Sequence, residues 1–157
     1  MQQATLLPEW QVSQWFNAPA PLSLAGLRGK IVVIEAFQML CPGCVAHGIP
    51  QAQKVAQIFN ANEVQVVGLH TVFEHHAGMG PASLEAFLHE YRISFPVGID
   101  MAGEAGDPIP KTMRAYRLQG TPSLLLVDRH GRLRKQKLGQ EQDMQLGAEI
   151  MSLLREG

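Results

Sequence analysis

The sequence contains only two cysteines, and just two residues separate them in the motif Cys41-Pro42-Gly43-Cys44. Two thiols this close can form and break one disulfide between themselves, whereas such a bridge closes too small a loop to stabilise a fold. The apolar run 31–37 comes shortly before the motif, and a helical pattern follows it. The spacing therefore predicts reversible dithiol–disulfide chemistry where a strand meets a helix.

The two thiols should differ because the predicted helix begins between them. Cys41 lies at or just before the helix N-terminus, where free backbone N–H groups and the helix dipole favour negative charge. We therefore expect Cys41 to be the nucleophile. Cys44, one turn further on, should be more buried and act as the resolving thiol. Pro42 fits the first helical position without losing a hydrogen bond, and with Gly43 it forms the active-site loop.

A metal site is the main alternative use of this pair. A structural zinc site takes four ligands, and the sequence has no second Cys-x-x-Cys and no His-x-x-x-His. The alternative hypothesis is a metal-binding or metal-delivery module in which loop histidines join the cysteines. The candidates are His47, His70, His75 and His76, whose roles the sequence leaves open. We assign no metal. A peroxidase of the peroxiredoxin kind is disfavoured because no Thr-x-x-Cys precedes the helix.

The composition is that of an ordinary globular protein. The 157 residues are 46% apolar and 17% charged with a net charge of −1, which fits one domain over residues 1–157 and offers no basic stripe for nucleic acid. No apolar run is long enough to span a bilayer. The first residues lack a basic segment followed by an apolar one, so we expect a cytoplasmic protein, or a periplasmic one if a leader has been removed.

Hydrophobic periodicity predicts the elements that hold the motif. Continuous apolar runs at 31–37 and 64–70 indicate buried strands, and shorter strands are expected at 95–100, 123–127 and 132–138. Helices are expected over 42–60, 81–91, 111–118 and 140–154, with Pro50 kinking the first. Residues 1–21 contain both tryptophans and should form a covering segment. This order predicts an α/β fold with a central mixed sheet flanked by helices.

Four segments, in this order, resemble the thioredoxin superfamily, and within it the TlpA-like thiol–disulfide oxidoreductases, over residues 22–154. They are residues 23–30, the motif 41–44, the loop Gly120-Thr121-Pro122-Ser123 and the hairpin 128–132. The resemblance implies a thioredoxin-like fold with an N-terminal extension and a TlpA-like insertion. It also implies a thiol–disulfide oxidoreductase, expected to be a disulfide reductase, that acts on thiols and disulfides of protein partners. An unidentified reductant would recycle it, and the redox-active Cys41–Cys44 disulfide would serve in place of a cofactor.

The same resemblance assigns roles to three further residues. It implies that the Thr121–Pro122 peptide bond is cis, packs against the cysteines and shapes the substrate groove, a conformation that is rare outside such conserved positions. It also implies that Glu35, an acid six residues before Cys41 within the apolar strand, exchanges protons with Cys44. Burial of that carboxyl should raise its pKa and suit it to act as a base.

Three positions depart from the pattern of the family. Leu40 stands where thioredoxins usually have tryptophan, and His47 stands where many TlpA-like proteins have an acid. Pro50 lies nine residues after Cys41, whereas the corresponding proline usually lies eight residues after the first cysteine. The extra residue predicts an altered first turn of the helix.

Overall fold

The computed structural model describes residues 4–157, and at its centre lies strand β2 (Ile31–Phe37), whose seven residues are all buried. Uninterrupted β-branched and apolar side chains suit a strand covered on both faces. Around it the sheet has the order β1-β4-β3-β2-β5-β6. The other strands are β1 (Val12–Phe16), β3 (Val64–His70), β4 (Val97–Asp100), β5 (Ser123–Val127) and β6 (Leu133–Leu138). Pairs β2–β3 and β3–β4 are parallel and the rest antiparallel, which confirms the predicted mixed sheet.

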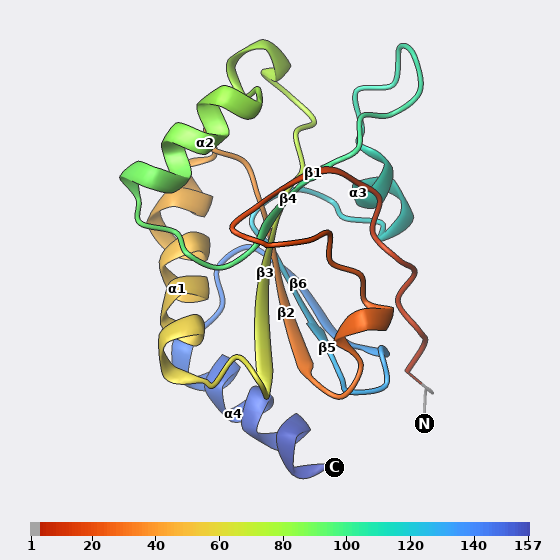
Figure 1. Cartoon of the computed structure of the whole chain (residues 1–157), viewed down its shortest axis with the longest axis vertical. Helices are drawn as coiled ribbons and strands as arrows, with labels where there is room; N and C mark the ends of the chain where they lie inside the picture. The colour runs from red at the N-terminus through yellow and green to blue at the C-terminus, as the bar shows by residue number, and fades with distance from the viewer. Residues whose placement is uncertain (1–3) are drawn as a thin grey trace.

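Helices cover one face of this sheet, and a short helix with the N-terminal segment covers the other (Figure 1). On the first face lie α1 (Ile49–Ile58), α2 (Pro81–Glu90) and α4 (Asp143–Arg155), and on the second lies α3 (Lys111–Ala115). Because successive side chains of a strand point to opposite faces, β2 contributes to both cores. Ile31, Val33 and Phe37 pack under the three helices, while Val32, Ile34 and Ala36 pack against the other layer. Glu35 therefore shares the face that α1 covers.

The N-terminal segment packs on the sheet through its tryptophans; residues 1–3 of the predicted covering segment 1–21 lie outside the described part. Trp10 is buried and packs edge-on against Trp15, and its indole N–H donates to the carbonyl of Leu22 at 2.8 Å. Glu9 accepts the backbone N–H groups at the start of a 3₁₀ turn, Ala25–Leu27. None of the helices among residues 4–157 is long and apolar enough to cross a membrane.

The helix after the cysteines begins differently from an ordinary α-helix. Residues Cys44–Gly48 form a π-helical turn before α1, and the N–H of Ile49 donates to the carbonyl of Cys44, five residues back. Pro50 has no N–H to donate, so the regular pattern of bonds is interrupted at this place anyway. A π turn holds one more residue than an α turn. It accounts for the spacing between Cys41 and Pro50 and confirms the predicted altered turn. The helix ends at Ile58 rather than at residue 60.

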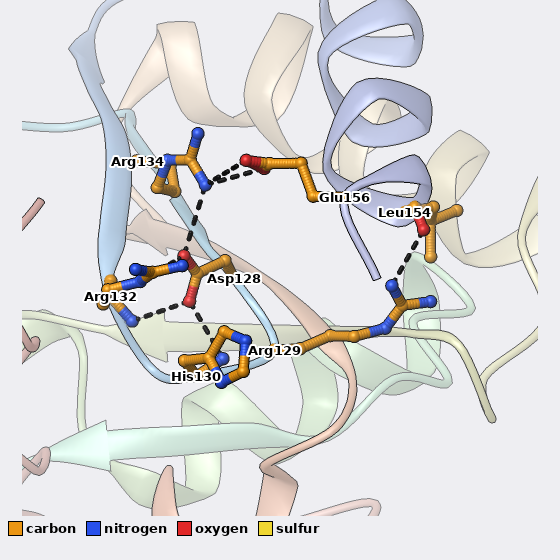
Figure 2. A network of polar contacts seen from close by, with 7 residues as sticks. All are labelled: Asp128, Arg129, His130, Arg132, Arg134, Leu154 and Glu156. Atoms are coloured by element: carbon orange, nitrogen blue, oxygen red, sulfur yellow. Dashed lines mark hydrogen bonds and ion pairs between the residues drawn. The ribbon is translucent and has the colours of Figure 1, made fainter.

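A polar network ties the hairpin between β5 and β6 to the end of α4 (Figure 2). Asp128 is buried and accepts hydrogen bonds from the backbone N–H groups of His130 and Arg132 and from the Arg132 side chain at 2.8 Å. Arg134 bridges Asp128 at 3.3 Å and Glu156 at 2.7 Å. These contacts hold the C-terminal end of α4 against the hairpin at the edge of the sheet.

Candidate active site

The two cysteines lie where β2 ends and the helix begins, as predicted, and both are free thiols. Cys41 is half-buried and Cys44 is fully buried, so only the first is open to a partner. The backbone N–H of Cys44 donates to the Cys41 sulfur at 3.3 Å, and the Cys41 thiol donates to the carbonyl of Thr121 at 3.5 Å. A backbone N–H directed at the sulfur stabilises negative charge on it.

Cys44 holds its proton strongly. Burial, followed by a hydrogen bond with Cys41, raises the pKa of Cys44 to about 12. Hydrogen bonds from the backbone of Gln38 and from the side chain of Thr121 act in the opposite direction and favour the thiolate. At neutral pH Cys44 is therefore a thiol, and any attack by it requires that its proton be removed.

Pro122 packs against the helix that carries the cysteines. The Thr121–Pro122 peptide bond is cis. A Cβ at Gly43 would lie 3.3 Å from the Pro122 ring, and one at Gly48 would lie 3.0 Å from the Pro122 Cβ. The proline thus fits between two glycines of the helix start, and Thr121 beside it remains half-buried next to Cys41.

Glu35 is buried beneath this helix start with 2% of its surface exposed. Burial, and then the charge of Cys41, raise the pKa of the Glu35 carboxyl well above its ordinary value. Its Oε1 atom has no hydrogen-bond partner among residues 4–157. The carboxyl lines a cavity of about 110 Å³ that also reaches His47 and Lys54, both of which are exposed. A cavity of this size can hold water, so the carboxyl has a route to solvent.

Two buried polar residues fix the end of β2: Gln38, which was not a candidate from the sequence, and His70, which was a candidate only as a metal ligand. Gln38 donates from Nε2 to the hydroxyl of Thr121 at 3.2 Å, and its Oε1 accepts the backbone N–H of Phe73 at 3.2 Å. His70 Nε2 accepts the backbone N–H of Met39 at 3.3 Å. Burial lowers the pKa of His70 to about 4, so the ring is neutral and able to accept at neutral pH. The sequence feature that could have identified Gln38 is its amide side chain, which directly follows the apolar run 31–37 and lies three residues before Cys41.

The other histidines do not converge on the cysteines. His47, His75 and His76 are exposed, and His76 Nε2 lies 3.0 Å from the carbonyl of Pro108. Within the described part of the chain, no group of three or more His, Cys, Asp or Glu side chains is arranged to hold a metal ion. The geometry gives no support to the metal-delivery alternative. Leu40, beside Cys41, is 57% exposed and presents an apolar side chain there.

Comparison with known protein families gives one match over most of the chain. The Redoxin family matches residues 3–150. Among characterised proteins, the thiol–disulfide oxidoreductase ResA of Halalkalibacterium halodurans is 24% identical over 134 residues, which cover 85% of this chain and 68% of ResA. Protein DipZ of Mycobacterium bovis is 28% identical over 131 residues, which cover 82% of this chain. The chain spans only 18% of the length of DipZ.

Solved structures agree with the thioredoxin-like fold. The crystal structure of a thioredoxin-like superfamily protein is 59% identical, with a TM-score of 0.95, and the match covers 98% of this chain and 99% of that one. A thiol–disulfide isomerase from Corynebacterium glutamicum is 52% identical, with a TM-score of 0.93 and coverage of 98% of both chains. The fold expected from the sequence is thereby confirmed.

Proposed function

The chain belongs to the Redoxin family, among the TlpA-like proteins of the thioredoxin superfamily, and on this premise we propose that it is a thiol–disulfide oxidoreductase that uses the Cys41–Cys44 dithiol to reduce disulfides in partner proteins. The observation that carries the proposal is the asymmetry of the two thiols. Cys41 is accessible and receives a backbone N–H, whereas Cys44 is buried directly behind it. This is the arrangement that a nucleophilic and a resolving thiol require.

In the first step the Cys41 thiolate attacks one sulfur of a substrate disulfide. A mixed disulfide forms between Cys41 and the partner, and the other substrate sulfur leaves as a thiolate that takes up a proton. Thr121 and Pro122 lie beside Cys41 and form the groove for the substrate chain in this proposal. Exposed Leu40 supplies an apolar contact for the partner.

In the second step Cys44 resolves the mixed disulfide. It loses its proton and attacks the Cys41 sulfur, so that the Cys41–Cys44 disulfide forms and the partner leaves reduced. Glu35 is the proposed base because burial raises the pKa of its carboxyl, and the raised pKa is closer to the pKa of a thiol. Water in the adjoining cavity can carry the proton between the two groups and out to solvent. A reductant of the dithiol class then restores both thiols.

The reductive direction and the cytoplasmic location are parts of the same proposal. The residues between the cysteines, Pro42 and Gly43, provide no charge that would stabilise a thiolate and make the disulfide a strong oxidant. In a reducing compartment such a couple is held as the dithiol. Equilibration with glutathione buffers of known potential tests the direction, because a reductase requires a potential well below that of a strong oxidant.

Turnover of a protein disulfide tests the activity itself. The chain should reduce insulin in the presence of dithiothreitol, and Cys41→Ser should abolish the reaction. Cys44→Ser should retain the first step and accumulate a mixed disulfide with its partner. If Cys41→Ser reduces insulin as fast as the unaltered chain does, the dithiol mechanism is wrong.

A further inference from the structure

The chain passes from β2 to the nucleophile through a tight turn over residues 38–41. The N–H of Cys41 donates to the carbonyl of Gln38 at 3.2 Å, which closes the turn. The last residue pair of the β2–β3 ladder is Phe37 with His70, so the turn lies beyond the paired part of the two strands. Something other than the ladder must therefore fix the position of the turn.

The side chain of His70 makes this connection. The backbone N–H of Met39, the second residue of the turn, donates to Nε2 of His70 at 3.3 Å. Both residues are buried, with 8% and 1% of their surfaces exposed. A buried N–H that loses its acceptor is unfavourable, so this bond resists displacement of the turn. The ring thus ties the turn to the last residue of β3.

The protonation state of the ring follows from the same bond. A backbone N–H can only donate, so Nε2 carries no hydrogen, and the hydrogen of the neutral ring is on Nδ1. Burial lowers the pKa of His70 to about 4, which keeps the ring neutral at pH 7. The ring also packs against Phe37 on the neighbouring strand, with 5.1 Å between the ring centroids. Nε2 is therefore available as an acceptor and is held in place by the core.

The position of the turn decides where the Cys41 sulfur lies. The sulfur receives the N–H of Cys44 at 3.3 Å and lies 3.5 Å from the carbonyl of Thr121. Cys44 belongs to the start of the helix and Thr121 to the cis-proline loop, whereas Met39 is only two residues before Cys41 along the chain. A displaced turn would change both distances, and an N–H stabilises a thiolate only at hydrogen-bond distance.

We propose that His70 is a positioning residue for the first attack: by accepting the Met39 N–H, its ring fixes the turn that holds the Cys41 sulfur against the N–H of Cys44. This inference rests on the proposed function and deepens it. In that attack a bond forms between the Cys41 sulfur and one sulfur of the substrate disulfide. The substrate disulfide bond breaks, and the other sulfur leaves with the electron pair and takes up a proton. His70 acts on the reacting sulfur only through the backbone of the turn.

Two substitutions separate the acceptor from the bulk of the ring. His70→Leu fills the core but offers no acceptor, whereas the side-chain oxygen in His70→Gln can accept the Met39 N–H. In a Cys44→Ser background only Cys41 can be alkylated, and the backbone N–H of residue 44 is kept. We expect iodoacetamide to alkylate Cys41 about ten-fold more slowly in His70→Leu at pH 7, the order of effect of one hydrogen bond to a charged group. His70→Gln should restore most of the rate.

Leu69→Ala is the matched control for lost packing. Leu69 is buried, precedes His70 on β3 and packs in the core that α1 does not cover. This variant should lower stability in urea denaturation and leave the alkylation rate unchanged. If His70 served packing alone, the apolar leucine would be tolerated better than the polar glutamine. Equal slowing in His70→Gln and His70→Leu, no slowing in either, or the same slowing in Leu69→Ala would overturn the inference.

The pH of the alkylation reaction gives a reading that loss of packing would not produce. At about pH 10, well above the ordinary pKa of a thiol, thiolate formation no longer limits alkylation. The difference between His70→Leu and the unaltered ring should therefore shrink there. Glu35, whose carboxyl interacts with Cys41, is the same in all these proteins. A ten-fold difference that persists at this pH would contradict the inference.

His70→Met takes the place of His70→Leu if the leucine variant does not fold, since its flexible side chain offers at most a weak acceptor. The same slowing is expected. Nitrogen NMR of the unaltered chain should show a neutral His70 ring with its hydrogen on Nδ1 at pH 7, and a hydrogen on Nε2 would overturn the inference. None of these readings requires turnover of a protein disulfide, so they test His70 even if the proposed function fails.

Discussion

Gly48 lies directly against the carboxyl of Glu35. A Cβ on Gly48 would overlap Glu35 Oε1, and it would lie 3.0 Å from the Cβ of Pro122. The π-helical turn Cys44–Gly48 brings the helix backbone this close to the buried acid. One glycine thus borders both the proposed base and the cis-proline loop.

Replacing Gly48 by alanine should destabilise the fold and slow resolution. The backbone of Gly48 is right-handed helical, with φ of −63°, so alanine gains about 1 kcal/mol in helix propensity. Overlap with Glu35 and Pro122 should outweigh that gain, because overpacking costs about 1–3 kcal/mol. Urea denaturation measures the net change. The control is Gly147→Ala in α4, where a Cβ meets no atom within 4 Å and alanine should stabilise.

Glu35→Gln should make the protein more stable at pH 8 but not at pH 4. The folded pKa of Glu35 is raised above 4.5, so the unfolded chain ionises this carboxyl first as the pH increases. Stability is therefore lost between pH 4.5 and the higher folded pKa, and glutamine removes that loss. Urea denaturation at both pH values tests the sign, and an equal effect of the substitution at both contradicts it.

The rate of the resolving step should depend on pH through the ionisation of Glu35. With the pKa of Cys44 at about 12, an unassisted thiol would react about ten-fold faster with each pH unit. If Glu35 removes the proton, the rate in the unaltered chain rises and then levels once the carboxyl is ionised. Glu35→Gln should be slower and rise steadily. A steady rise in both proteins would show that the carboxyl is not the base.

Asp128→Asn should destabilise the fold by about 1.5–3 kcal/mol, the contribution of hydrogen bonds to a charged group. Burial acts to raise the pKa of Asp128, but hydrogen bonds from Arg132, His130 and Arg134 hold it below the usual 3.8. Its contribution is therefore present above pH 3.8 and lost as the pH falls through the lower folded pKa. Thermal unfolding at pH 7 and below pH 3.8 measures it; an equal effect of the substitution at both contradicts this account. Asp107→Asn, which removes an exposed pair with Arg114, is the control and should change little.

Much of this architecture is predictable because the local signals agree with the tertiary structure. The bounds of β2 and β3 match the two apolar runs, since strands buried on both faces have little polar interruption. For the start of the helix, the sequence predicted an altered first turn but not that this turn is π-helical. A π turn depends on how an extra residue before Pro50 is accommodated against Glu35, which is a tertiary contact.

The polar residues of the site also differ in whether the sequence alone identifies them. Glu35 was recognisable because an acid in an apolar strand is unusual, and Cys41 and Cys44 because of their spacing. Gln38 and His70 were not, because their roles depend on backbone groups of Phe73 and Met39 that only the fold brings to them. His70 belonged to a candidate metal cluster in the sequence, yet it is a neutral hydrogen-bond acceptor inside the core.

The central claim is that Cys41 attacks and Cys44 resolves, and intact mass after reaction with a model peptide disulfide tests it most directly. Cys44→Ser should gain the mass of one peptide, located at Cys41 by proteolysis. Cys41→Ser should gain none at the same pH and time, and the unaltered chain should lose two hydrogens as it releases the reduced peptide. A stable adduct on Cys44, or equal labelling of the two variants, would contradict this account.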